Sequence, residues 1–187
     1  MILIIGIVGV AIGIYAVGYM RGYIQHHSEF ADRRRFFFCM IFIFYGAMFG
    51  LVSSASLIWI YFFWEVTSVV SFLLIGYTRT EEAINNCFKA LWMNLLGGCG
   101  LAAAITYGVY VENLYNIISS GAGEVGLIFP IAMLAFAALT KSAQFPFSGW
   151  LLGAMVAPTP SSALLHSATM VKAGVYMLIR ISTAMNG

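Results

Sequence analysis

The sequence is poor in charged residues. Asp, Glu, Lys and Arg make up 9% of its 187 residues, against roughly 25% in a typical soluble domain. So few charged side chains cannot cover the surface of a soluble core of this size. Hydrophobic residues account for 61% of the chain, and its mean hydropathy is +0.92. The composition therefore predicts an integral membrane protein.

Cysteine and clustered basic residues are also scarce. Cys39, Cys87 and Cys99 lie in apolar runs without CxxC spacing, so we expect buried small residues rather than a disulfide or metal framework. His26 and His27 have no neighbours at ligand spacing, which favours a solvated loop over a metal site. No basic cluster with interleaved aromatics suggests nucleic acid. No flavin, nucleotide, iron–sulfur or quinone motif is visible, so we expect no cofactor.

The apolar runs are long and show no alternation of period two, which favours helices over barrel strands. We expect an all-α membrane protein with six transmembrane helices and no soluble domain, so that 1–187 is a single transmembrane domain. The first run lacks a cationic start and a small-residue cleavage site, so we do not expect a signal peptide. Glycines at 97, 98 and 100 are expected to loosen or bend the fourth helix. The six predicted spans are 2–19, 36–52, 57–77, 83–111, 127–157 and 159–182.

The fifth run is too long for one simple span, and it contains a proline. Pro146 removes one backbone hydrogen bond of a helix. We therefore predict a helix broken near Lys141–Pro146, with one half ending near Ala143, an extended piece at 144–147, and a second half reaching 156. Irregular backbone at membrane depth is tolerated only inside protein or beside water, and discontinuous helices recur at ion sites in transporters.

The charges of the loops predict the topology. Six crossings place both termini on one side, and only Arg180 is near that side. The loops of the opposite side carry the other arginines. The positive-inside rule therefore places the arginine-rich loops in the cytoplasm and the termini outside. The arginines concerned are Arg21, Arg33, Arg34, Arg35 and Arg79.

Five ionisable residues fall within the predicted spans, namely Glu65, Lys89, Lys141, His166 and Lys172. Such residues are rare in membranes, face protein or water, and often mark an ion path. Burial disfavours the charged form of a lysine, whereas a nearby carboxylate favours it. A carboxylate and a lysine that meet at mid-depth can therefore act as a proton switch, and we predict that Glu65 and Lys141 form one.

Each of these residues also has a structural interpretation. Glu65 and Lys141 can be a buried ion pair that only fixes helix register. Lys89 is close enough to its helix start to reach the membrane surface, and His166 can be a hydrogen-bonded interior residue. Two alternatives to an ion-translocating subunit of a larger complex therefore stay open: a structural membrane subunit with non-conducting buried ion pairs, and a stand-alone six-helix transporter.

Three stretches resemble a known family: WEVTSVVSFLLIGY at 64–77, FKAL at 88–91, and LTKSAQFPFSGWLLGAMVAPTPSSALLHSATMVKAGVYMLIR at 139–180. They are similar to the antiporter-like proton-translocating membrane subunits. This family includes the distal membrane-arm subunits of respiratory complex I, the large subunit of Mrp-type Na+/H+ antiporters, and subunits of membrane-bound hydrogenases. The resemblance covers nearly the whole chain. HSATMVKAGVY, around Lys172, is more similar to the Mrp and hydrogenase branch.

The resemblance implies a role for each ionisable residue. Glu65 matches the family glutamate of the first half-channel, and Lys141 the proton-carrying lysine of the broken helix. His166 and Lys172 match the residues that pass protons onward, and Lys89 a lysine on the next helix. The implied function is proton, or cation/proton, translocation in a multisubunit energy-converting complex. Any redox chemistry belongs to partner subunits of a complex I-like or hydrogenase-like oxidoreductase, and none is needed in an Mrp-type antiporter.

The resemblance also implies how the chain is organised. Family members contain two five-helix units related by inverted symmetry, with flanking helices. Residues 36–187 are similar to the first unit, a half-channel, and residues 1–35 form a flanking helix and a cytoplasmic loop. We expect another chain to supply the second unit, together with further membrane subunits and the lipid bilayer. An energy-transducing membrane, in particular a prokaryotic cell membrane, is the expected location.

Overall fold

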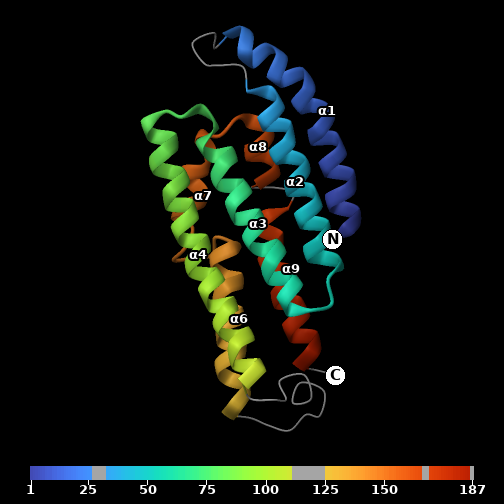
Figure 1. Ribbon diagram of the computed structural model, residues 1–187, viewed down its shortest axis with the longest axis vertical. Helices are drawn as coiled ribbons and strands as arrows, with labels where there is room; N and C mark the ends of the chain where they lie inside the picture. The colour runs from blue at the N-terminus through green and yellow to red at the C-terminus, as the bar shows by residue number, and fades with distance from the viewer. Residues whose placement is uncertain (27–32, 111–124, 166–168, 186–187) are drawn as a thin grey trace.

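The computed structural model describes residues 1–26, 33–110, 125–165 and 169–185. Within these ranges the regular secondary structure is helical, and no strand occurs. The helices form an elongated bundle whose long helices run up and down its long axis (Figure 1). The predicted all-α class is therefore confirmed.

The described helices follow one another in antiparallel fashion. α2 packs against α3, α3 against α4, α4 against α6, and α6 against α9 (Figure 1). The core between them is lined by side chains such as Phe44, Ile60, Trp64 and Leu101. The elements are α1 (Ile2–His26), α2 (Arg34–Ser53), α3 (Leu57–Ile75), η1 (Gly76–Thr78), α4 (Glu81–Tyr110), α6 (Val125–Lys141), α7 (Gly149–Gly153), η2 (Ala154–Val156), α8 (Thr159–Ala163) and α9 (Met170–Met185).

Four helical segments of the described chain are long and apolar enough to cross a membrane, namely Ile2–Tyr23, Arg34–Ser53, Leu57–Thr78 and Glu81–Gly108. The shorter α6 corresponds to the first half of the predicted fifth span. The predicted sixth span, 159–182, is not one continuous helix, because α8 and α9 are separate elements and Thr169 lies in a bend. The count of six spans therefore stays a prediction.

The loop predicted at 21–35 is shorter in the structure. α1 continues through Arg21 to His26, and α2 already begins at Arg34. Polar residues end the apolar run without ending the helix, because arginine and glutamine are good helix formers. The long stem of Arg21 can stay on the helix while its guanidinium reaches the membrane surface. His27 lies outside the described residues.

The predicted helix break is present. α6 ends at Lys141, two residues before the expected position, and α7 begins at Gly149. The intervening residues are turns rather than the extended piece that we expected, and the Phe147 N–H donates to the Gln144 carbonyl over 2.6 Å. The Phe145–Pro146 peptide bond is cis, and Ala143 has a φ of 50°. Hydrogen-bonded turns satisfy backbone groups that an extended strand would leave unpaired at this depth.

The prediction of three buried cysteines is wrong for two of them. Cys87 is buried, whereas Cys39 and Cys99 are exposed on the surface of the chain. The outer face of a membrane helix is itself apolar, so an apolar run does not separate inward from outward positions. This ambiguity explains the error.

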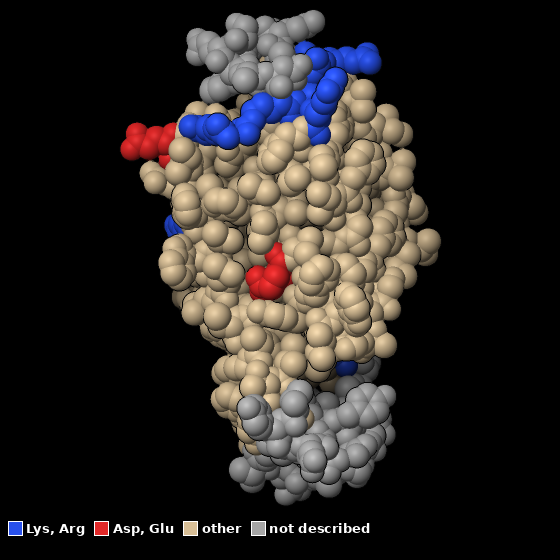
Figure 2. Space-filling model, in the orientation of Figure 1, with Lys and Arg blue, Asp and Glu red and all other residues tan. Residues whose placement is uncertain are grey.

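In Figure 1 the start of α1 lies near mid-height, away from the upper end of the molecule, and α9 ends lower down. The Lys and Arg side chains gather mainly at the upper end in Figure 2, above a broad belt that is mostly uncharged and carries one acidic patch near the centre of this face. This arrangement agrees with the predicted separation of arginine-rich turns from termini. Which end faces the cytoplasm stays a prediction.

Candidate functional site

Lys141 is the last residue of α6, and its side chain is 0% exposed. Its ammonium donates to the Trp64 carbonyl over 3.1 Å and to Ser68 Oγ over 2.8 Å. The same ammonium lies 5.1 Å from the centre of the Trp64 ring, within the range of a cation–π contact. The end of the broken helix is thus fastened to one turn of α3.

Glu65 lies in that same turn of α3. Its side chain is half-buried, and Oε1 is buried without a hydrogen-bond partner. The hydrogen bonds of the Lys141 ammonium go to Trp64 and Ser68 rather than to Glu65. Glu65 directly follows Trp64, whose carbonyl accepts a hydrogen bond from the Lys141 ammonium. The structure therefore brings the two predicted switch residues together as neighbours without a direct hydrogen bond.

Glycines of α4 allow this close packing. A Cβ atom added at Gly98 would overlap Glu65 Oε1, and one added at Gly97 would overlap Thr140 Oγ1. Helix α4 is continuous from Glu81 to Tyr110 through these glycines. They therefore serve the close approach of α3 and α6 to α4, and the helix does not break there.

The broken end of α6 is also fixed from the opposite side. Trp150 Nε1 in α7 donates to the Thr140 carbonyl over 3.0 Å, and Ser142 Oγ donates to the Val171 carbonyl of α9 over 2.9 Å. The Thr140 carbonyl lies at the helix C-terminus, where carbonyls lack partners within the helix, and it accepts from both Trp150 and the Ala143 N–H. Lys141 is thus held at a rigid junction of α3, α6, α7 and α9.

Three buried side-chain atoms in the described chain lack a hydrogen-bond partner: Trp64 Nε1, Glu65 Oε1 and Asn94 Oδ1. Asn94 was not predicted as a site residue. Its amide donates to the Ala90 carbonyl over 2.8 Å, and its side chain is 1% exposed. Because residues three and four apart share a helix face, Asn94 lies on the same face of α4 as Gly97 and Gly98. The one sequence feature that could have indicated Asn94 is its amide side chain within the apolar run LWMNLL.

The other predicted residues are less closely connected to this junction. Lys89 is exposed on α4, and a Cβ atom added at Gly149 would lie 3.5 Å from its Nζ atom. Lys172 is exposed in the first turn of α9. His166 lies outside the described residues. The structure therefore joins Glu65 with Lys141, while the roles of Lys89, Lys172 and His166 stay predictions.

The sequence matches the family described as "NADH:quinone oxidoreductase/Mrp antiporter, TM" over residues 54–187. The chain belongs to this antiporter family. The match contains Glu65, Lys141 and the helix break between them. The resemblance found in the motifs is confirmed, and the protein is an antiporter-family membrane subunit.

Curated relatives of this antiporter-family chain include the Na(+)/H(+) antiporter subunit A1 of Staphylococcus aureus strains JH9 and Newman. Each is 41% identical to it over 178 residues. The alignment covers 91% of this chain and 22% of each relative. The chain thus spans about a fifth of the length of the curated relatives that it matches.

Proposed function

We propose that this antiporter-family chain translocates protons, or exchanges a cation for protons, as one membrane subunit of a multisubunit energy-converting complex. The main support for the proposal is the fully buried Lys141 ammonium. It is hydrogen-bonded to Trp64 and Ser68 of α3, which precede and follow Glu65 in the sequence. A buried ammonium is costly in a membrane, and it is usually retained for function. Residues 36–187 form the half-channel unit in this proposal, and residues 1–35 flank it.

The proposed switch has two states. An ionised Glu65 attracts the Lys141 ammonium and favours the protonated lysine. When Glu65 is neutralised or moves away, that attraction is lost, and burial in apolar surroundings favours release of the lysine proton. Because the two groups interact, their protonation steps belong to the pair rather than to either residue. Uptake at one group is thereby linked to release at the other.

Polar atoms beside the switch supply the local part of a proton path. Ser68 Oγ accepts a hydrogen bond from Lys141 and donates one to the Trp64 carbonyl over 3.0 Å. The unpartnered atoms of Trp64, Glu65 and Asn94 lie on the adjoining turns of α3 and α4. Buried polar atoms are normally hydrogen-bonded to protein or ordered water. We place the water of the proposed relay at these atoms.

Lys172 is the proposed carrier beyond the switch. It is exposed on α9 together with Val175 and Ile179, three and seven residues later in the helix. A lysine on a lipid-facing surface at this level would be costly. In the proposal a second membrane chain, which supplies the other half of the antiporter-like unit, covers this face of α9 and receives the proton. His166 and Lys89 are assigned the connecting positions.

The decisive experiment measures proton movement in everted membrane vesicles with a pH-sensitive dye. Lys141→Arg keeps a positive charge and N–H donors for Trp64 and Ser68, but arginine does not release its proton. We expect it to lower the initial rate by about 100-fold, the lower end of the usual contribution of a proton-transfer group. Glu65→Gln, which cannot ionise, should lose transport similarly. Arg35→Gln, an exposed charge change on α2, is the matched control and should retain transport.

A structural subunit is the second candidate, because the Lys141 hydrogen bonds also fasten α6 to α3. If the chain is only a structural subunit, the variants Lys141→Arg and Glu65→Gln should transport protons normally whenever the complex assembles normally. Assembly is checked by co-purification of the partner chains. Active protein purified as an oligomer of this chain alone would instead support a stand-alone transporter.

The proposed orientation places the arginine-rich end in the cytoplasm of a prokaryotic cell. Arg35→Cys provides the test, because this exposed position lies near the start of α2. A membrane-impermeant maleimide should label it in everted vesicles and not in intact cells. Labelling only in intact cells would reverse the orientation.

A further inference from the structure

A groove opens where the start of α2 meets the corner between α3 and α4. Its volume is about 360 Å³. The lining residues that belong to the described part of the chain include two arginines, Arg33 and Arg79, and no acidic side chain. The apolar part of the lining is formed by Phe36, Phe72, Leu73, Ile84 and Phe88.

The groove has a cationic rim and an apolar wall. Arg33 directly precedes α2, and Arg79 lies between η1 and α4. The Lys and Arg side chains gather mainly at the upper end of the bundle (Figure 2). Phe72 in α3 and Phe88 in α4 lie farther along the helices from that end, and their rings meet edge to face at 5.2 Å between centroids. Phe88 is 49% exposed, so this wall is open to the surroundings of the chain.

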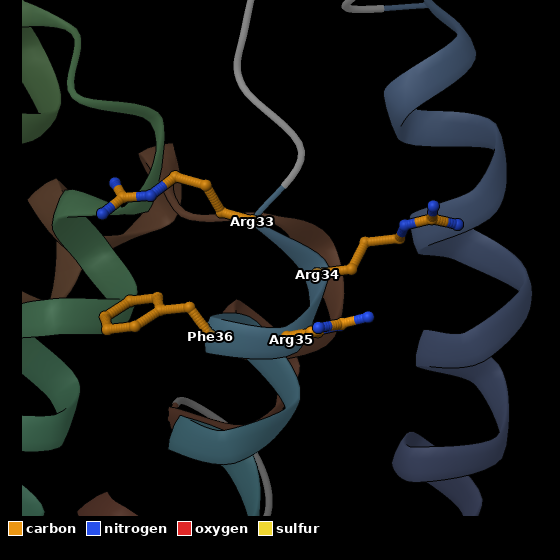
Figure 3. A pocket seen from close by; sticks show the side chains of 4 residues that line it. All are labelled: Arg33, Arg34, Arg35 and Phe36. Atoms are coloured by element: carbon orange, nitrogen blue, oxygen red, sulfur yellow. The ribbon is translucent and has the colours of Figure 1, made fainter.

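The direction of the arginines matters for the charge of the groove. Arg33 and Phe36 point toward the ribbon that joins α3 to α4, whereas Arg34 and Arg35 point toward α1 (Figure 3). The Arg33 guanidinium lies 5.2 Å from the centre of the Phe36 ring. The acidic residues that follow Arg79, Glu81 and Glu82, are exposed in the first turn of α4 and do not line the groove.

We infer that this groove binds an anionic phospholipid, with the phosphodiester between Arg33 and Arg79 and an acyl chain along Phe72 and Phe88. A guanidinium presents paired N–H donors that match the oxygens of a phosphate. The groove lies at the end of membrane-spanning helices, where lipid headgroups are the most abundant anions. A free phosphate would use the rim alone and would leave the apolar wall without a function.

The test is native mass spectrometry of the protein, purified with whatever subunits it retains, during titration with dioleoylphosphatidylglycerol. We expect one tightly bound lipid. Each of the two groove arginines, placed beside the anionic headgroup, should contribute about fivefold to its binding. Arg33→Gln combined with Arg79→Gln should therefore weaken binding about 25-fold. Arg35→Gln removes one positive charge at the same end but outside the groove, and it should bind like the unchanged protein.

Three further binding measurements distinguish an anionic phospholipid from a neutral lipid, a short-chain lipid and free phosphate. Phosphatidylcholine with the same chains should not occupy the tight site, and dihexanoylphosphatidylglycerol should bind much more weakly than the dioleoyl lipid. Inorganic phosphate should not displace the bound lipid. Equal binding of both headgroups, equal binding by the double variant, or displacement by phosphate alone would each overturn the inference. Circular dichroism confirms that the variants remain folded.

Discussion

Lys141 Nζ lies 2.8 Å from Ser68 Oγ, although 73 positions separate the two residues in the sequence. This bond joins the end of α6 to the middle of α3. Ser68 is three residues after Glu65 on the helix, so the ammonium and the carboxylate approach the same face of α3. Four substitutions test how this junction and the turns around it are held.

Ser68→Ala removes the hydroxyl acceptor of the Lys141 ammonium. We expect a loss of about 1–3 kcal/mol in the free energy of unfolding, because the buried ammonium then loses one of its two hydrogen-bond acceptors and keeps only the Trp64 carbonyl. The measurement is equilibrium unfolding in mixed micelles, followed by circular dichroism. Ser71→Ala is the matched control, since Ser71 Oγ donates to the Ser68 carbonyl within its own helix. Equal losses in both variants would contradict the role of the bond between α3 and α6.

Gly98→Ala places a methyl group where Glu65 Oε1 lies. Overpacking of this kind typically costs about 1–3 kcal/mol, and it should also displace the Glu65 carboxylate. Gly46→Ala is the control, because a Cβ atom there meets nothing within 4 Å. Alanine favours a helix over glycine by roughly 0.5–1 kcal/mol, so the control should be unchanged or slightly more stable. Thermal unfolding of both variants in one detergent makes the comparison, and equal stability would show that the Gly98 contact is not needed.

Trp150→Phe keeps an aromatic ring but removes the indole N–H that binds the Thr140 carbonyl. We expect a loss of about 1 kcal/mol and faster hydrogen exchange of amides around the helix break, measured by mass spectrometry. Trp92→Phe is the control, because the Trp92 side chain is 73% exposed. Unchanged exchange around the break in Trp150→Phe would mean that other contacts hold the end of α6.

Arg180→Gln removes the guanidinium that binds two successive carbonyls of the turn between α2 and α3. Its Nη1 atom donates to the Ser54 carbonyl over 2.7 Å, and Nη2 donates to the Ala55 carbonyl over 3.1 Å. Hydrogen bonds of a charged group are worth about 1.5–3 kcal/mol, and we expect a loss in that range in equilibrium unfolding. Arg180→Lys should recover part of it, because an ammonium cannot reproduce the planar fork. A Lys variant as stable as the unchanged protein would contradict the importance of the fork.

The sequence was informative where one side chain has a strong local effect. Long apolar runs predicted α1 to α4, and Pro146 predicted the break after Lys141. Because charged residues are rare in the apolar runs, Glu65 and Lys141 could be recognised as candidates, and the structure places them beside each other. The motifs correctly indicated the antiporter family. These predictions depend on residue identity and spacing, which a sequence states directly.

Other features depend on packing, which a sequence does not state. The Trp64 carbonyl binds Lys141, yet every residue has a carbonyl, so none can be singled out beforehand. Asn94 was missed because its burial depends on which face of α4 meets α3 and α6. Helix α1 extends past Arg21, since polarity marks the end of an apolar run and not the end of backbone hydrogen bonding. The outward orientation of Cys39 and Cys99 was missed because an apolar run does not show which of its faces meets the core.

Helix α1 lies at the edge of the bundle, and its outer face exposes residues such as Leu3, Ile7, Val10 and Ile14. The side-chain hydrogen bonds that connect it to the rest of the chain include those from Tyr45 to the Gly9 carbonyl and from Thr159 to Tyr19. Local unfolding begins where few buried contacts must be lost. A mechanical force applied to the N-terminus would therefore detach α1 as a first, separate step. The helices that hold Lys141 would give way only at a later rupture.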